Sequence, residues 1–278
     1  MPVSTAQKRA DFRKLHESGC FVLPNPWDVG SALLLQGMGF KALASTSSGL
    51  AWSIGHSDNN VNRDHVLAHL KTLCDATDLP VNADFEAGFA HDPAVVAANV
   101  ARGVDTGVAG LSIEDSTGDV SAPLYEMTLA VERMRAARAA IDAKGGDIVL
   151  VGRCESFLVG QPDLKATIAR LVAYAEAGAD CLYAPGIRTR EQIAAVVKEL
   201  APKPINVLMG GPGLTVAELT DLGVRRISIG GALARAAWGG FLRAAREIAE
   251  KGSFSELAHA VTHAEINGFF IKVAKDRK

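Results

Sequence analysis

The feature that most restricts the fold of this chain is a regular alternation of short apolar segments with longer amphipathic ones. Each apolar segment has the composition of a buried strand, and a stretch with helical spacing of its apolar residues follows it. The expected strands cover residues 21–23, 42–44, 79–83, 109–113, 148–151, 181–184, 205–208 and 226–229. Eight such units predict an α/β protein with a (β/α)8, or TIM, barrel. A doubly wound open sheet is the alternative, but the glycines after the first strand lack the dinucleotide-binding spacing.

Capping residues set the expected helix ends. A polar helix is expected over residues 5–17, ahead of the first strand. Asn25 is expected to cap the next helix, with Pro26 at its first position and an end near Gly37. Residues 45–62 are expected to form a long loop of small residues. Later helices are expected at 63–76, 93–106, 129–143, from Leu164 to a close at Gly178, and at 190–200, 216–222, 231–250 and 254–271.

No linker or composition break interrupts this pattern, so residues 1–278 are expected to form a single barrel domain. Residues 231–278 would be a helical extension at its C-terminal end. In that extension Phe254, Leu257 and Val261 lie at helical spacing on one face. Such a face must be buried against something, either the chain's own barrel or a neighbouring subunit.

Composition excludes several classes of protein. The net charge is −2 and basic clusters are absent, which argues against nucleic acid as a partner. No apolar run approaches the ~18 residues of a membrane span, and the N-terminus lacks the apolar core of a signal peptide. The four cysteines are scattered, with no metal-ligand spacing. These features predict a cytoplasmic protein with free thiols and no membrane partner.

Polar residues gather where four successive strands end. Asp84 and Glu86 follow the third strand, and residues two apart in an extended chain point to the same side. Two carboxylates at one spot repel each other unless a cation lies between them, and hard divalent cations take such ligands. Residues 45–49, 114–115 and 153–155 end the second, fourth and fifth strands. In a barrel all of these ends meet at the C-terminal face, where active sites lie.

Six motifs in order give the chain a specific resemblance. They are Ser48-Gly49-Leu50, the acid Asp58, Asp84-Phe85-Glu86-Ala87-Gly88-Phe89, Ile113-Glu114-Asp115, Gly152-Arg153-Cys154-Glu155 and the segment from Ala173 to Asp180. In this order they resemble the isocitrate lyase/phosphoenolpyruvate mutase superfamily, in its 2-methylisocitrate lyase-like or oxaloacetate decarboxylase-like branch. The likeness extends from about residue 10 to residue 245. Two of the acids are longer here, because Glu86 and Glu155 stand where the family has Asp.

The resemblance implies a role for each matching residue. It implies a Mg²⁺ ion, with Mn²⁺ possible, held by Asp84 directly and by Asp58, Glu86 and Glu114 around it. The turn formed by Ser47, Ser48, Gly49 and Leu50 would hold the substrate carboxylate, assisted by Arg153 and Glu155. Arg153, Glu114 and Asp58 would take part in catalysis. The implied reaction is C–C cleavage or decarboxylation of a small 2-oxo or 2-hydroxy acid through a metal-stabilised enolate.

One departure from the family affects the reaction. Lyase members have a loop with a catalytic Cys after the Glu-Asp strand end, whereas residues 115–125 here contain no Cys, Lys or His. Tyr125 and Asp119 are the candidates for a substitute acid. The alternatives are phosphoenolpyruvate mutase or phosphonopyruvate hydrolase-type P–C chemistry, or a non-catalytic 2-oxo acid-binding protein. The resemblance also implies a homodimer or homotetramer in which a C-terminal helix is swapped between subunits.

Overall fold

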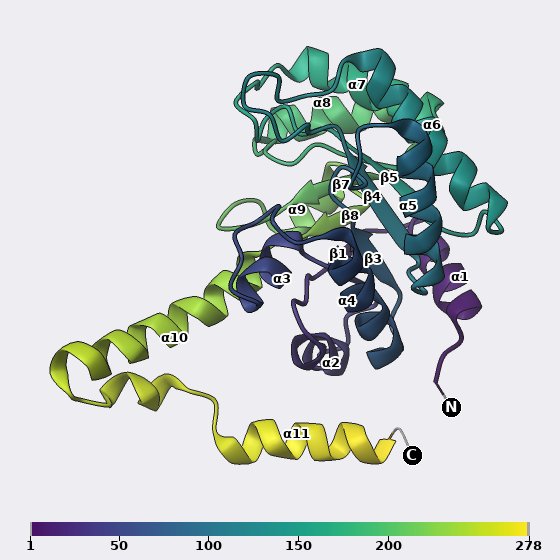
Figure 1. Ribbon diagram of the computed structural model, residues 1–278. Helices are drawn as coiled ribbons and strands as arrows, with labels where there is room; N and C mark the ends of the chain where they lie inside the picture. Colours follow the sequence, from purple (N-terminus) through teal and green to yellow (C-terminus); the bar gives the residue numbers. More distant parts are fainter. Residues whose placement is uncertain (1, 277–278) are drawn as a thin grey trace.

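The computed structural model describes residues 2–276, which contain a barrel of eight parallel strands surrounded by helices (Figure 1). The strands are β1 (Phe21–Leu23), β2 (Leu43–Ala44), β3 (Val81–Asp84), β4 (Gly110–Glu114), β5 (Val149–Arg153), β6 (Cys181–Tyr183), β7 (Ile205–Leu208) and β8 (Arg226–Ser228). From β2 to β8 each strand pairs with the next one in chain order, and β8 pairs with β1. Between β1 and β2 the Ala44 N–H donates to the Pro24 carbonyl (3.1 Å). The predicted (β/α)8 barrel is confirmed.

The helices of residues 2–276 lie outside the strands, except where α1 covers the N-terminal end of the barrel. They are α1 (Thr5–Leu15), α2 (Val29–Gly37), α3 (Ser47–Ser53), α4 (Arg63–Ala76), α5 (Pro93–Asp105), α6 (Met127–Ala143), α7 (Leu164–Glu176), α8 (Arg190–Leu200), α9 (Val216–Asp221), α10 (Ala232–Lys251) and α11 (His263–Asp276), with a 3-10 helix at Ser255–His259. Phe12 of α1 is fully buried inside the barrel, among Phe21 and Val149. Gly110 makes room for it, because a Cβ there would lie 2.6 Å from the Phe12 ring.

Three local expectations were wrong. Asp28, not Asn25, caps α2, and its carboxylate accepts the Ser31 N–H in a capping box. The expected loop over residues 45–62 contains α3, a short helix capped by Thr46. The expected helix over 254–271 is broken, because Ala260 is extended and Thr262 accepts the Glu265 N–H to start α11.

Residues 232–276, called here the C-terminal arm, leave the barrel. Figure 1 shows α10 projecting away from the other helices, after which the chain turns and α11 runs back below α2. The two parts touch where the Phe269 ring lies against Gly37. Large apolar residues on the arm are exposed: Trp238, Phe241, Leu242, Ile248, Phe254, Leu257, Val261, Ile266 and Ile271.

Two further expectations concern thiols and membranes. The four cysteines are free, and Cys74, Cys154 and Cys181 are buried. Across residues 2–276 the helices are too short or too polar to cross a bilayer.

Candidate active site

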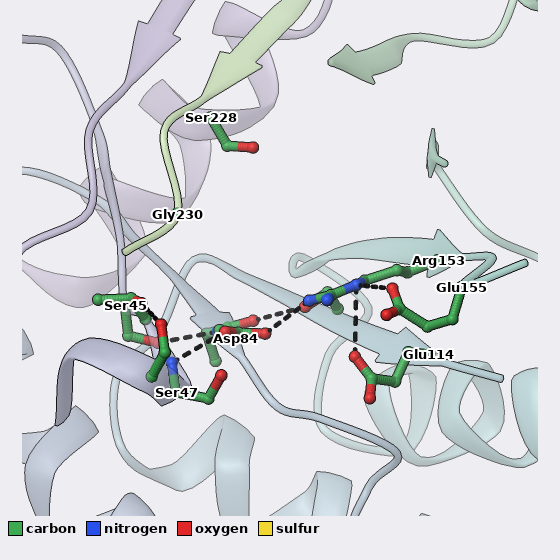
Figure 2. Close-up of polar contacts among 12 residues, drawn as sticks. Ser45, Ser47, Asp84, Glu114, Arg153, Glu155, Ser228 and Gly230 are labelled. Atoms are coloured by element: carbon green, nitrogen blue, oxygen red, sulfur yellow. Dashed lines mark hydrogen bonds and ion pairs between the residues drawn. The ribbon is translucent and has the colours of Figure 1, made fainter. Parts of the chain in front are cut away.

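Asp84 and Arg153 meet at the C-terminal face of the barrel. Asp84 ends β3, Arg153 ends β5, and their Oδ1 and Nη1 atoms lie 3.1 Å apart (Figure 2). The second Asp84 oxygen accepts the Ser47 backbone N–H (2.9 Å), and the Asp84 N–H donates to Ser45 Oγ (2.8 Å). These contacts join the ends of β2, β3 and β5, which the sequence predicted to meet at this face.

Arg153 is surrounded by carboxylates. Its Nε lies 3.3 Å from Glu114 Oε2 and also donates to Glu155 Oε1. Burial opposes the charge on Arg153, but Glu155, Glu114 and Asp84 raise its pKa well above the usual value. Burial also raises the pKa of Glu114, and Arg153 opposes that shift. Arg153 is therefore a fixed cation held among three acids.

Two more acids approach Asp84 from loops. Glu86 has a left-handed backbone (φ 48°), which is uncommon for a residue other than glycine. Burial, followed by repulsion from Asp84 and Asp58, raises the pKa of Glu86 to about 8. Asp58 lies on the exposed loop after α3, and partial burial and Asp84 raise its pKa. Carboxyl groups are thus crowded around Asp84, with Arg153 as the nearby cation.

The loop that carries Glu86 is held from behind by α6. Arg133 is 1% exposed, and its guanidinium donates to the backbone carbonyls of Ala87, Ala90 and His91. It also stacks on the Tyr125 ring, 3.9 Å from the centroid. Arg133 therefore fixes the loop in the conformation that brings Glu86 to Asp84.

Residues 47–50 form the first turn of α3. The Gly49 N–H donates to Thr46 Oγ1 (3.3 Å) and the Leu50 N–H to the Thr46 carbonyl, so these two amides take part in the helix cap. The Leu50 side chain is in the core. Position 49 has no room for a side chain, because a Cβ there would lie 2.6 Å from the Thr46 side chain. That this turn binds the carboxylate of a substrate stays a prediction.

A cavity of about 160 Å³ opens between these residues and the barrel interior. It is lined by Asn25, Ala44, Ser45, Thr46, Ser47, Ser48, Asp58, Asn82, Asp84, Ser112, Arg153, Tyr183, Leu208, Arg226, Ser228, Gly230 and Gly231. Tyr125 and Asp119 do not line it. The Tyr125 hydroxyl is paired with His91 Nδ1 (2.6 Å), and Asp119 is exposed and bonded to Ser121.

Asp115, beside Glu114, has a structural position. Its carboxylate accepts the Tyr174 hydroxyl (2.5 Å) and the Glu155 backbone N–H (2.8 Å), and it pairs with Arg170 (3.2 Å). These bonds fix the turn after β5 and hence the direction of Glu155. The two acids therefore have different partners: Glu114 pairs with Arg153, whereas Asp115 binds residues of α7.

The donor set fits a hard divalent cation. Asp84, Glu86 and Asp58 offer oxygen ligands. Burial, followed by repulsion from Asp84, raises the pKa values of Glu86 and Asp58, and a cation would relieve that repulsion. In residues 2–276 no three His, Cys, Asp or Glu side chains are placed to hold an ion together. Mg²⁺ usually keeps several waters, so one or two carboxylates can suffice.

Sequence reasoning missed part of the cavity. Asn82, Arg226 and Ser228 also line it, and none of them was predicted from the ends of the strands. The sequence contains a pattern that could have indicated them. Asn82 and Asp84 are two residues apart on one strand, and so are Arg226 and Ser228, so the side chains of each pair point to the same side. Asn25 was assigned to a helix cap, yet its amide oxygen accepts the Ile229 and Gly230 N–H groups and joins β1 to β8.

The chain is similar to several proteins that are named as lyases or mutases. 2-Methylisocitrate lyase of Escherichia coli K12 is 34% identical over 166 residues, which cover 58% of this chain and 55% of that protein. A Burkholderia cenocepacia J2315 structure described as a candidate lyase/mutase is 48% identical, with a TM-score of 0.94 over 96% of this chain and 97% of that one. A structure of 2,3-dimethylmalate lyase, described as a PEP mutase/isocitrate lyase superfamily member, is 26% identical, with a TM-score of 0.84 over the whole of both chains.

The family model for phosphoenolpyruvate phosphomutase matches residues 12–249, which include the whole barrel and every residue of the cavity. The chain therefore belongs to the phosphoenolpyruvate phosphomutase family, within the PEP mutase/isocitrate lyase superfamily.

Proposed function

We propose that the chain is a Mg²⁺-dependent carbon–carbon lyase or decarboxylase acting on a small 2-oxo or 2-hydroxy acid. The observation that carries this proposal is the crowding of Asp84, Glu86, Asp58 and Glu114 around one half-buried guanidinium, that of Arg153, at a cavity of small-acid size. Relatives named 2-methylisocitrate lyase and 2,3-dimethylmalate lyase support it.

In this proposal Asp84 holds the ion directly, and Asp58, Glu86 and Glu114 hold its waters. When bound, Mg²⁺ would act as a Lewis acid on the oxo and carboxylate oxygens of the substrate. Arg153 faces the same cavity as a fixed cation and would stabilise negative charge that develops on the oxo oxygen. Glu155 and Glu114 keep Arg153 in that position.

Turnover assays with Mg²⁺ test the proposal. Oxaloacetate, methylisocitrate, dimethylmalate and phosphonopyruvate would be supplied separately, with Asp84→Ala as the inactive control. Release of a C–C cleavage or decarboxylation product that depends on Mg²⁺ and on Asp84 supports the proposal. Activity on phosphonopyruvate alone would favour P–C chemistry, to which the family name points.

A second candidate is a 2-oxo acid-binding protein without catalysis. It is favoured by the placement of Tyr125 and Asp119, because neither proposed acid lines the cavity. Mg²⁺-dependent binding of these acids without any product, at protein concentrations above those of the substrates, would establish it.

We also propose that the chain associates with itself. The C-terminal arm exposes Trp238, Phe241 and Leu242 on α10, and an apolar face of this size needs a partner surface. A second copy that receives α10 on its own barrel would bury this face, in a homodimer or a homotetramer.

A further inference from the structure

Tyr183, at the end of β6, lines the cavity of the candidate active site and has no role in the proposed function. It is 8% exposed, and the Arg153 guanidinium lies 5.3 Å from the centroid of its ring. The proposed reaction still needs an acid, because an enolate must receive a proton on carbon after the carbon–carbon bond has broken. Residues 115–125 contain no Cys, and neither Tyr125 nor Asp119 lines the cavity. Tyr183 carries an ionisable proton next to the cation that is proposed to stabilise the oxo oxygen.

A chain of hydrogen bonds inside the barrel ends at Tyr183. Arg226 Nε donates to Asn206 Oδ1 (2.9 Å), and Asn206 Nδ2 donates to Ser228 Oγ (2.9 Å). Ser228 is in turn hydrogen-bonded to Tyr183. All four side chains are buried, and they come from the neighbouring strands β6, β7 and β8. Figure 2 shows Ser228 apart from the cluster around Asp84, so this chain reaches the cavity from another side of the barrel.

Arg226 fixes the direction of the chain at its start. A guanidinium has only donors, so the Asn206 amide turns its oxygen toward Arg226 and its nitrogen toward Ser228. Ser228 Oγ receives that N–H group and keeps its own proton to donate to the Tyr183 oxygen. Because the Tyr183 oxygen accepts on the barrel side, its own O–H group is left to donate into the cavity that it lines.

The neighbours of Tyr183 also suit the loss of that proton. Burial raises the pKa of Tyr183 to about 12, whereas Arg153 and the hydrogen bond from Ser228 lower it. The hydroxyl therefore has its proton at neutral pH, as an acid must before it acts. The phenolate that forms on proton transfer would lie between a guanidinium and a hydroxyl donor. An enolate carbon is a stronger base than a phenolate, so the transfer runs toward the product.

We propose that Tyr183 is the catalytic acid that protonates the enolate carbon, in place of the cysteine that residues 115–125 lack. The inference rests on the proposed function and adds the proton donor to it. In decarboxylation the C–C bond breaks, CO₂ leaves, and the electron pair stays on the enolate. That pair forms a C–H bond with the Tyr183 proton, the O–H bond breaks and leaves a phenolate, and the C=O bond of the product forms again. Water then returns a proton to Tyr183, and the hydroxide combines with CO₂ as bicarbonate.

Tyr183→Phe tests the proposal, because it removes the hydroxyl and keeps the ring beside Arg153. With the best substrate of the panel, kcat should fall at least about a hundredfold, the usual contribution of a positioned acid. Calorimetric titration in the presence of Mg²⁺ should give an oxalate affinity within about twofold of wild type, since oxalate resembles the enolate in shape and charge and needs no proton. Tyr125→Phe removes the rival hydroxyl, which is paired with His91, and its loss of kcat should be at least tenfold smaller.

Hydrogen exchange measures the same proton transfer in reverse. In D₂O with Mg²⁺, wild-type protein should exchange the methyl hydrogens of pyruvate, because the acid of one direction is the base of the other. Proton NMR follows the exchange. Tyr183→Phe should exchange pyruvate no faster than the solution without protein.

The outcomes separate this inference from the proposed function. Wild-type turnover together with a Tyr183→Phe variant whose kcat stays within about threefold would overturn the inference and leave the proposed function standing. Pyruvate exchange that persists in Tyr183→Phe would overturn it as well. A loss of oxalate affinity as large as the loss of kcat would show that Tyr183 binds the substrate and does not protonate it. Wild-type protein that neither converts any acid of the panel nor exchanges pyruvate would contradict the proposed function, and this inference with it.

Discussion

Arg153 Nη1 lies 3.1 Å from Asp84 Oδ1, so the residue proposed to bind the metal directly is already paired with a cation. The other Asp84 oxygen is bonded to the Ser47 N–H. A metal ion that binds Asp84 must therefore share or replace these two contacts. This relationship links metal binding to the position of Arg153 and underlies the first two predictions.

Asp84→Ala should abolish Mg²⁺ binding and activity but leave the fold intact, since Asp84 lies at the rim and outside the apolar core. Calorimetric titration with Mg²⁺ measures the loss, and circular dichroism checks the fold. Asp119→Ala is the control, because Asp119 is an exposed loop acid away from the cavity. An unchanged Mg²⁺ affinity in Asp84→Ala would contradict the metal assignment.

Arg153→Lys should reduce kcat/KM by at least about a hundredfold although it keeps the charge. Arg153 reaches Asp84, Glu114 and Glu155 at once, and a single ammonium cannot reproduce that planar set of donors. Steady-state kinetics on the best substrate of the panel tests this. Kinetics close to wild type would remove Arg153 from the catalytic residues.

Glu86 should make the metal-free protein less stable as the pH rises. The carboxyl titrates near 4.5 when unfolded and at about 8 when folded, so between these values the folded state retains a proton that the unfolded state has lost. Glu86 therefore contributes its full stabilisation below pH 4.5 and loses it as the pH rises toward 8. Over this range the free energy of unfolding falls by at most about 1.4 kcal/mol per pH unit. Denaturant unfolding with a chelator should show this slope, and Glu86→Gln should flatten it. Equal slopes in both proteins would refute the assignment.

Arg133→Met should lower the free energy of unfolding by roughly 2–4 kcal/mol, because each buried carbonyl left without a donor costs about 1–3 kcal/mol. The carbonyls of Ala87, Ala90 and His91 lose their common donor. The loop that carries Glu86 should loosen, and Mg²⁺ affinity should fall as well. Arg135→Met, on the same helix, is the control for loss of a charge. Unaltered Mg²⁺ affinity in Arg133→Met would show that the loop does not need this support.

The barrel and its rim could be predicted because they follow from strand periodicity. Asp84, Glu114 and Arg153 each end a short apolar strand, and parallel strands of a barrel bring such ends together. α3 could not be predicted in this way, because a seven-residue helix of small side chains has too few turns to show a period. It depends instead on the Thr46 cap.

The inner part of the cavity, lined by Asn82 and Arg226, was missed for a different reason. Arg226 begins β8, and an arginine at the start of a strand normally points to solvent. Its direction depends on the residues opposite it, since Asn206 and Asn82 supply the acceptors that draw it into the barrel. Such a set comes from three separate strands, and a pattern along one strand does not reveal it.

Self-association is the last prediction, and it rests on the C-terminal arm. Phe254, Leu257 and Val261 are 63%, 48% and 58% exposed in the single chain. Association would bury these side chains, each contributing about 1–2 kcal/mol at ~25 cal/mol per Å². The intact chain, of 29.2 kDa, should therefore give the mass of a dimer or tetramer in light scattering.

Truncation after Lys251 removes those three side chains and α11 but leaves the barrel whole. The truncated protein should form smaller assemblies and bind more of a dye that reports apolar surface, because the partner surface loses its cover. Val120→Ser is the control, since Val120 is 94% exposed but lies on the loop after β4, outside the arm. That variant should assemble like wild type. An intact chain that stays monomeric at all concentrations would refute the role of the arm, because an apolar face that is never covered in solution cannot be an interface between subunits.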